Sequence, residues 1–228
     1  MAPWHGGTGA PLPVIAAVVA AALLMPARAA AQSLSAAATV FNAQHRISFA
    51  GTVSERTGVF IGAGGAARLG PVQIGLTSLM GSLADSEDPA NSATSVRSTS
   101  LTVMVRAAPW VALGAEAEAR VFDADGGVTS WLLLGATARL TPPMGGSGLA
   151  GLIEVTMFPA ATSRPLGASI SPALRGTAGV SFAFNGPFEA RLGYRFERFD
   201  FAADAGGDAR LEQFRGIVAG VGLRLGRR

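Results

Sequence analysis

Hydrophobic and polar residues alternate one by one over the first ten residues of Phe188–Phe201, whose sequence is FEARLGYRFERFDF. Phe188 and Leu192 fall on one side of the alternation, and Glu189 and Arg191 fall on the other. A period of two places successive side chains on opposite faces of a β-strand. The segment therefore predicts a strand with one apolar and one charged face, and it leaves open which face meets water.

The same period recurs in segment after segment between residues 46 and 225, so that ten strands are predicted, with eight as the alternative count. Each segment is close to the length of about 10 residues that a tilted strand needs to cross a bilayer. In chain order the predicted strands are Arg46–Ser54, Val59–Leu69, Val72–Ala84, Leu101–Arg106, Val111–Phe122, Leu132–Leu140, Leu149–Phe158, Leu174–Phe184, Phe188–Phe201 and Gly216–Leu225. The pattern indicates an all-β fold, an antiparallel up-and-down barrel.

The connections between these segments alternate between short turns and longer polar links. Consecutive connections lie at opposite ends of an up-and-down sheet, so the turns gather at one end and the links at the other. The turns are Gly70-Pro71, Ala108-Pro109, Gly186-Pro187 and a slightly longer one at Pro142–Gly146. The links are Asp85–Ser95, Asp123–Gly127, Pro159–Ser171 and Ala202–Ala209, with a brief one near Glu55-Arg56.

Composition helps to decide which face meets water. The chain of 228 residues is 49% hydrophobic and only 14% charged, with a mean hydropathy of +0.38. A soluble surface is about 25–35% charged, whereas the polar faces here consist mostly of Gly, Ala, Ser and Thr. The apolar faces are therefore predicted to contact lipid and the charged faces to be enclosed. A soluble periplasmic lipid-binding barrel, with the faces reversed, is the alternative.

Aromatic residues at or beside the predicted strand ends support the membrane interpretation. Barrels that cross a membrane carry aromatic girdles at the two interfaces. The residues predicted to form these girdles are Trp110, Phe122, Phe158, Phe184, Phe188 and Phe199.

The N-terminus resembles a targeting segment. Val14–Met25 is an apolar run, and it is followed by small residues within Ala27–Gln32. A run this short is typical of a secretory signal peptide, because a membrane-spanning helix needs about 20 residues. Cleavage is expected near Ala29 or Ala31, which predicts a signal peptide at 1–31, a periplasmic segment at 32–45 and a barrel at 46–228.

The even strand number, the turns at one end, the links at the other and the signal peptide together resemble bacterial outer-membrane β-barrels, in particular small OmpA-like and OmpX-like barrels. The resemblance is architectural, covers about residues 46–225 and rests on no residue motif. It implies periplasmic turns and extracellular links. It also implies a monomer in the outer membrane, with a structural or surface-interaction role, whose partners are membrane lipids, lipopolysaccharide and the barrel-assembly machinery.

The charged residues of the enclosed faces are the candidate functional residues. In so narrow a barrel they must pair or stay hydrated. They form either an Arg/Glu network that fills the lumen or a narrow water passage in which excess arginine favours anions. The predicted network is Arg106, Glu116, Glu118, Arg120, Arg139, Glu154, Arg175, Glu189, Arg191, Arg195 and Glu197, and Arg46, Arg68 and Arg224 share the enclosed face.

Several classes of function are disfavoured. All 18 basic residues are arginines, spread singly through the chain rather than clustered as nucleic-acid binding requires. Without cysteine there is no thiolate metal site and no cysteine nucleophile. His45, the one histidine of the predicted mature chain, is expected at the periplasmic rim, away from the links, so no catalytic site and no cofactor are predicted.

Acidic residues of the links could in principle bind a divalent cation. Their spacing does not match a known calcium-binding loop, so no metal site is predicted. These residues are Asp85, Glu87, Asp88, Asp123, Asp125, Asp204 and Asp208.

Overall fold

The computed structural model describes residues 33–85, 93–124, 126–145, 148–164, 170–202 and 209–226, apart from the side chains of 171 and 172. The predicted signal peptide and most acidic link residues lie outside these ranges. The strands are β1 (Ser33–Phe49), β2 (Thr52–Leu69), β3 (Val72–Asp85), β4 (Thr94–Ala108), β5 (Val111–Ala124), β6 (Gly127–Leu140), β7 (Leu149–Arg164), β8 (Ile170–Ala183), β9 (Phe188–Phe201) and β10 (Arg210–Gly226). Within the described ranges, no helix is long and apolar enough to cross a membrane.

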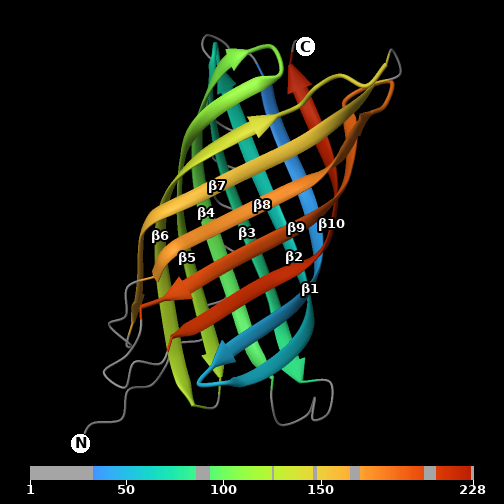
Figure 1. Ribbon diagram of the computed structural model, residues 1–228. Helices are drawn as coiled ribbons and strands as arrows, with labels where there is room; N and C mark the ends of the chain where they lie inside the picture. The colour runs from blue at the N-terminus through green and yellow to red at the C-terminus, as the bar shows by residue number, and fades with distance from the viewer. Residues whose placement is uncertain are drawn as a thin grey trace, which may run out of the picture.

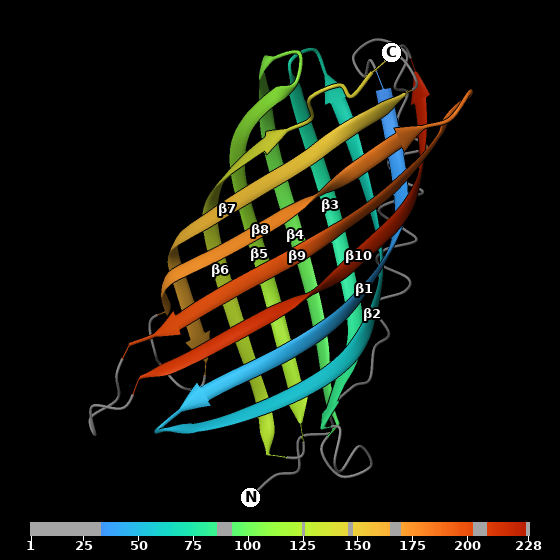
Figure 2. The same cartoon turned by 45° about the vertical axis from the view of Figure 1, so that its right-hand side comes forward.

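The ten strands close into one antiparallel barrel, as Figures 1 and 2 show from two directions. Each strand pairs with its neighbours in sequence, and β1 pairs with β10 so that Ser33 lies opposite Gly226. Closure gives every strand two partners and leaves no open sheet edge. The predicted fold class is confirmed, with ten strands rather than eight.

The two ends of the barrel differ. At the terminal end, where β1 begins and β10 finishes beside the label C in Figure 1, the turns 70–71, 109–110, 141–148 and 184–187 join the strands. At the opposite end, called the link end, the connections are 50–51, 86–93, 125–126, 165–169 and 202–209. Short turns thus predominate at the end where the barrel begins and finishes.

The first strand was predicted in the wrong place. Residues 33–45 belong to β1 instead of a periplasmic segment, and the first turn is Ala50-Gly51, not a link near Glu55-Arg56. Small residues on both faces, such as Ala36–Ala38, conceal the period of two in β1. The turn has φ of 48° at Ala50 and 76° at Gly51, a backbone shape that usually selects Asn-Gly. Ala-Gly gives no such signal.

The strands are longer than the sequence pattern indicated, at 14 to 18 residues. Pro159–Arg164 belongs to β7 rather than to a link, and β10 begins at Arg210 rather than Gly216. A strand of 14 residues tilted by about 40° rises about 36 Å, whereas the apolar band of such a barrel is only about 25 Å tall. The strands therefore extend well beyond the apolar band.

The outer wall is apolar over most of its height. Large hydrophobic side chains point outward on every strand, among them Ile61, Leu192 and Val221, each more than half exposed. Soluble monomers rarely expose apolar patches on this scale. The outer wall therefore argues for a barrel in lipid, and the prediction of a soluble periplasmic barrel is wrong.

The predicted aromatic girdle is only partly correct. Phe184 and Phe188 are exposed on the outside at the terminal end, as expected, whereas the half-exposed Trp110 lines the mouth of the lumen there. Phe122 and Phe158 are instead buried inside the barrel, as is Phe199. These three rings occupy the same strand phase as the enclosed charges, so their apolar character was misleading.

Charged side chains on the outer wall lie near the link end, where they form what we call the outer collar. Within it Arg198 pairs with Asp200 at 2.9 Å and Arg46 lies 3.8 Å from Glu55. Arg46 was expected in the lumen, but Ala43 and His45 occupy the inner phase of β1 and Arg46 the outer one. Among the described residues the collar consists of Arg46, Glu55, Arg97, Asp123, Arg164, Arg198, Asp200 and Arg215.

Candidate functional site

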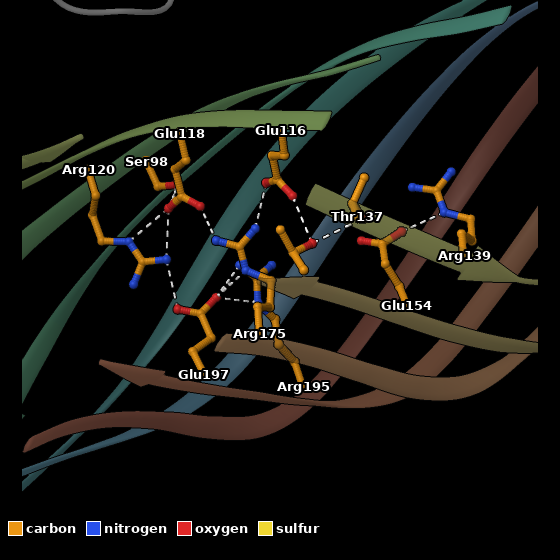
Figure 3. A network of polar contacts seen from close by, with 11 residues as sticks. Ser98, Glu116, Glu118, Arg120, Thr137, Arg139, Glu154, Arg175, Arg195 and Glu197 are labelled. Atoms are coloured by element: carbon orange, nitrogen blue, oxygen red, sulfur yellow. Dashed lines mark hydrogen bonds and ion pairs between the residues drawn. The ribbon is translucent and has the colours of Figure 1, made fainter. Parts of the chain in front are cut away.

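Six charged side chains meet in the middle of the lumen. We call them the central network, which Figure 3 shows from close by. They project inward from β5, β8 and β9, because each occupies the inner phase of its strand. The central network consists of Glu116, Glu118, Arg120, Arg175, Arg195 and Glu197.

Arg175 is the hub of the central network. Each nitrogen of its guanidinium group contacts a different carboxylate. Nη1 donates to Glu116 at 2.6 Å, Nε donates to Glu197 at 2.9 Å, and Nη2 contacts Glu118. A planar fork of fixed donors is suited to such an arrangement, whereas a lysine ammonium is not. Arg175 thereby connects β8 with β5 across the lumen.

Glu197 is the matching acceptor. Its carboxylate contacts Arg120 at 2.7 Å and Arg175 at 2.9 Å, and it accepts a hydrogen bond from Arg195 Nε at 2.7 Å. Arg120 also contacts Glu118 at 2.7 Å. The side chain of Glu197 is only 1% exposed, so its charge depends on these three guanidinium groups rather than on water.

Hydroxyl groups complete the central network, and sequence analysis missed all of them. Ser98 donates to Glu118 at 2.8 Å. The Thr156 hydroxyl lies 3.1 Å from Glu116 and 3.0 Å from Thr137. A hydroxyl has one hydrogen, so Thr156 donates to Glu116 and accepts from Thr137. Serine and threonine are common on all inner faces, and nothing in the sequence distinguishes these three.

The charges of the central network balance, with three carboxylates and three guanidinium groups. Of its atoms, none is among the buried polar atoms without a partner in the described part of the chain. Buried charges are tolerated when they are paired and hydrogen-bonded. The arrangement can hold the barrel wall together across its interior, because it joins β5 to β8 and β9, which are not neighbours of β5 in the sheet.

The other five predicted residues lie outside the central network. Arg139 pairs with Glu154 nearer the terminal end. Glu189 contacts both Arg191 and Arg224 at the terminal end, the latter at 2.7 Å. Arg106 is likewise at the terminal end and forms no ion pair with a described residue. The eleven predicted residues therefore share one face of the wall but belong to different levels of the lumen.

An aromatic cluster occupies the lumen between the central network and the link end. Arg120 connects the two groups, because its guanidinium carbon lies 5.1 Å from the Phe214 ring and 5.2 Å from the Phe199 ring. The rings pack against one another, as for Phe122 and Trp131 with centroids 4.6 Å apart. Buried members of the cluster are Phe41, Phe60, Phe122, Trp131, Phe199, Phe201 and Phe214.

His45 lies inside the barrel toward the link end, so its prediction at the periplasmic rim is wrong. Its Nε2 lies 2.9 Å from Glu212, which also contacts Arg210 at 2.6 Å. The ring is stacked on Phe214, with centroids 4.0 Å apart, and is 4% exposed. The error follows from the misplaced first turn. Glu212 and Arg210 were missed because β10 continues in phase before Gly216.

The described residues contain no group of three or more metal-ligating side chains that could hold a metal ion. Much of the acidic link sequence lies outside them.

Comparison with known proteins gives likeness in structure alone. No protein-family model and no curated protein sequence matches the chain. The outer membrane protease OmpT from Escherichia coli is similar in structure, with a TM-score of 0.56 and 8% identity over 85% of this chain and 97% of that one. The translocator domain of the autotransporter NalP from Neisseria meningitidis has a TM-score of 0.44 and 17% identity, covering 92% and 98%. For Neisserial surface protein A the TM-score is 0.37 and the identity is 13%, over 83% of this chain and 96% of that one.

These observations agree on the type of protein. The strands form a closed antiparallel barrel with a membrane-facing apolar wall, a charged interior and short turns where the barrel begins and finishes. At 8% identity, the likeness to OmpT concerns the fold. The chain has the fold of the bacterial outer-membrane β-barrels, with ten strands.

Proposed function

We propose that the protein is a closed outer-membrane barrel with a structural or surface-interaction role rather than a conducting channel. The central network carries this proposal. Arg175 and Glu197 connect β5, β8 and β9 across the lumen with side chains that are at most 6% exposed. A conducting pore keeps its polar lining hydrated, whereas these side chains satisfy one another.

The aromatic cluster supports the same function. Between the central network and the link end, Phe199 and Phe214 are buried to at least 98%. An ion would have to pass a paired charge layer and then a packed apolar layer. Each layer opposes passage, the first because its charges are engaged and the second because it cannot hydrate an ion.

A conductance measurement tests the closed barrel. The purified protein is expected to produce no steady unit conductance in a planar bilayer, because paired side chains fill the middle of the lumen. Flotation with liposomes and a gel shift on boiling serve as controls for insertion and folding. Reproducible open steps with a preference for anions, from protein that passes both controls, would establish the alternative narrow channel.

His45 gives no support for an enzyme. Its imidazole is covered by Phe214 and paired with Glu212, so a substrate arriving at the link end meets neither ring nitrogen. A general base must lie within hydrogen-bonding reach of its substrate. The proposed role is therefore non-enzymatic.

The outer collar is the proposed contact with lipopolysaccharide. Five of its eight members are arginines, and it follows the apolar wall at the link end. Arginine forks bind phosphate groups well, and the outer-leaflet lipid is the phosphate-bearing partner available at that height. This proposal requires that the link end is extracellular.

Cysteine labelling tests that orientation, since the chain has no cysteine of its own. Ser92→Cys in the 86–93 link is expected to react on intact cells with a maleimide that cannot cross the outer membrane. Thr141→Cys, beside the 141–148 turn, is expected to react only after the outer membrane is permeabilised. The opposite pattern would mean that the barrel is inserted the other way round.

A further inference from the structure

The terminal half of the lumen contains a cavity that the closed-barrel function does not use. Its larger part has a volume of about 420 Å³ and its smaller part about 170 Å³. Both are lined by Ser35, Gln73, Arg139 and Arg224 among others, so they form one space, which we call the vestibule. Pro71, Pro109 and Thr141 at its rim belong to the terminal-end turns. The vestibule therefore opens at the terminal end, which faces the periplasm in the proposed orientation.

Positive charge dominates the lining of the vestibule. Glu189 is the single acidic side chain on it, against five arginines. Glu189 is shared by Arg191 and Arg224, and Arg139 is paired with Glu154. The five arginines are Arg68, Arg106, Arg139, Arg191 and Arg224.

Arg106 and Arg68 have no carboxylate partner among the described residues. Arg68 donates to the backbone oxygen of Gly70 at 3.1 Å. Arg106 lies close enough to Arg68 and Arg224 for their charges to repel its own. Glu189 and Glu154 each neutralise one of the five positive charges. Three guanidinium charges of the lining therefore stay uncompensated.

Among the described residues, Glu154 and Glu189 are the only carboxylates that pair with these arginines. Of the 15 acidic residues, those outside the described ranges are Glu87, Asp88, Asp125, Asp204 and Asp208. In the sequence, all five fall between strands that are joined at the link end. The central network is itself neutral and cannot offset the vestibule.

We propose that the vestibule binds a phosphate-bearing anion with two or more negative charges from the periplasmic side. Clustered guanidinium groups without acidic partners repel one another, and a multivalent oxyanion removes that repulsion while accepting their hydrogen bonds. Small polar residues such as Ser33, Ser35 and Gln73 leave room between the arginines and add further hydrogen-bonding groups. Binding at this site does not require that the central network and the aromatic cluster close the rest of the lumen.

Calorimetric titration of the refolded protein with inorganic pyrophosphate tests the site. Saturable binding of one pyrophosphate per barrel is expected, stronger than binding of monophosphate and weakened by added salt. Arg106→Gln is expected to weaken it about tenfold, because one charge-assisted contact is lost. Arg210→Gln is the matched control, because Arg210 pairs with Glu212 at the link end, away from the vestibule, and it is expected to bind as the parent does.

Unfolding in urea separates binding from a structural role. Without pyrophosphate, Arg106→Gln is expected to unfold at the same or a higher urea concentration than the parent, because it relieves repulsion. With pyrophosphate, the parent is expected to gain more stability than the variant. Absence of saturable binding, or an equal loss of pyrophosphate affinity in Arg106→Gln and Arg210→Gln, would overturn the proposal.

The source of the phosphate group is distinguished by the surrounding lipid. A lipid headgroup at the rim would compete, so pyrophosphate binding would fall in nanodiscs of phosphatidylglycerol compared with phosphatidylcholine. Equal binding in the two lipids would assign the site to a soluble periplasmic phosphate compound. Both results presuppose the binding site, which the titration in detergent decides.

Discussion

Replacement of Glu197 by alanine is expected to lower the free energy of unfolding by about 3–5 kcal/mol, the loss typical of breaking a buried ion-pair network. Glu197 contacts Arg120, Arg175 and Arg195. Without it, the central network keeps three guanidinium groups and two carboxylates in a region that excludes water. The unfavourable energy arises from the positive charge left behind more than from the attraction removed.

Two further variants make this result interpretable. Glu55→Ala on the outer collar removes a half-exposed carboxylate 3.8 Å from Arg46 and is expected to change stability by less than about 1 kcal/mol. Glu197→Gln keeps the shape and two hydrogen-bonding groups but removes the charge, so its stability should lie between those of Glu197→Ala and the parent. The free energy of unfolding of all three variants is measured in urea, with gel mobility of unboiled samples as the readout of folded protein.

Conductance of the same variants separates the two functions considered for the lumen. If the central network is structural, Glu197→Ala loses stability. If the lumen is a water-filled passage, the same variant shows altered ion selectivity with little change in its free energy of unfolding. A variant as stable as Glu55→Ala and with a new conductance would refute the structural role of the central network.

The face of each strand could be predicted from the sequence more securely than the partners of its side chains. In the first ten residues of β9 the period of two is strict, and Glu189, Arg195 and Glu197 indeed line the lumen. The pairing of Arg175 with Glu118 was beyond such reasoning, because it joins β8 to β5 across the interior. Alternation determines the direction of a side chain, whereas contacts across a lumen depend on strand tilt and stagger.

Hydrophobic character also led to a wrong prediction of which side of the barrel wall particular aromatic residues occupy. Phe122, Phe158 and Phe199 were taken for girdle residues because aromatic rings at strand ends generally meet an interface, yet they pack inside the barrel. Their inward phase was visible in the sequence, since Phe122 follows Arg120 by two positions and Phe199 follows Glu197 by two. Phase along the strand is therefore the better guide in a barrel whose interior holds both charges and rings.

The limits of alternation are clearest in β1. Ser33–Phe49 carries small residues on both faces, so the contrast between them disappears, and its pairing with β10 closes the barrel. The consequence extended to His45, which was assigned to the wrong end. A single misplaced turn thus moved the one histidine of the described chain from the lumen at the link end to the opposite rim.

Replacement of Leu192 by arginine is expected to destabilise the barrel by about 2–4 kcal/mol, the penalty for a lipid-facing arginine near the bilayer midplane. Leu192 is 56% exposed on the outer wall of β9. It lies four residues from the aromatic Phe188 at the terminal end, which corresponds to about 10 Å along the membrane normal for a tilted strand. That depth is close to the middle of an apolar band about 25 Å tall.

Val53→Arg is the matched control, because Val53 is similarly exposed at 52% but lies beside Glu55 of the outer collar. Its expected penalty is only about 0–1 kcal/mol, as for an arginine near the interface. Unfolding of both variants in lipid vesicles compares the same side chain at two heights on the same wall. Equal penalties would mean that the wall around Leu192 is not in hydrocarbon, since only the hydrocarbon makes the cost of an arginine depend on its depth.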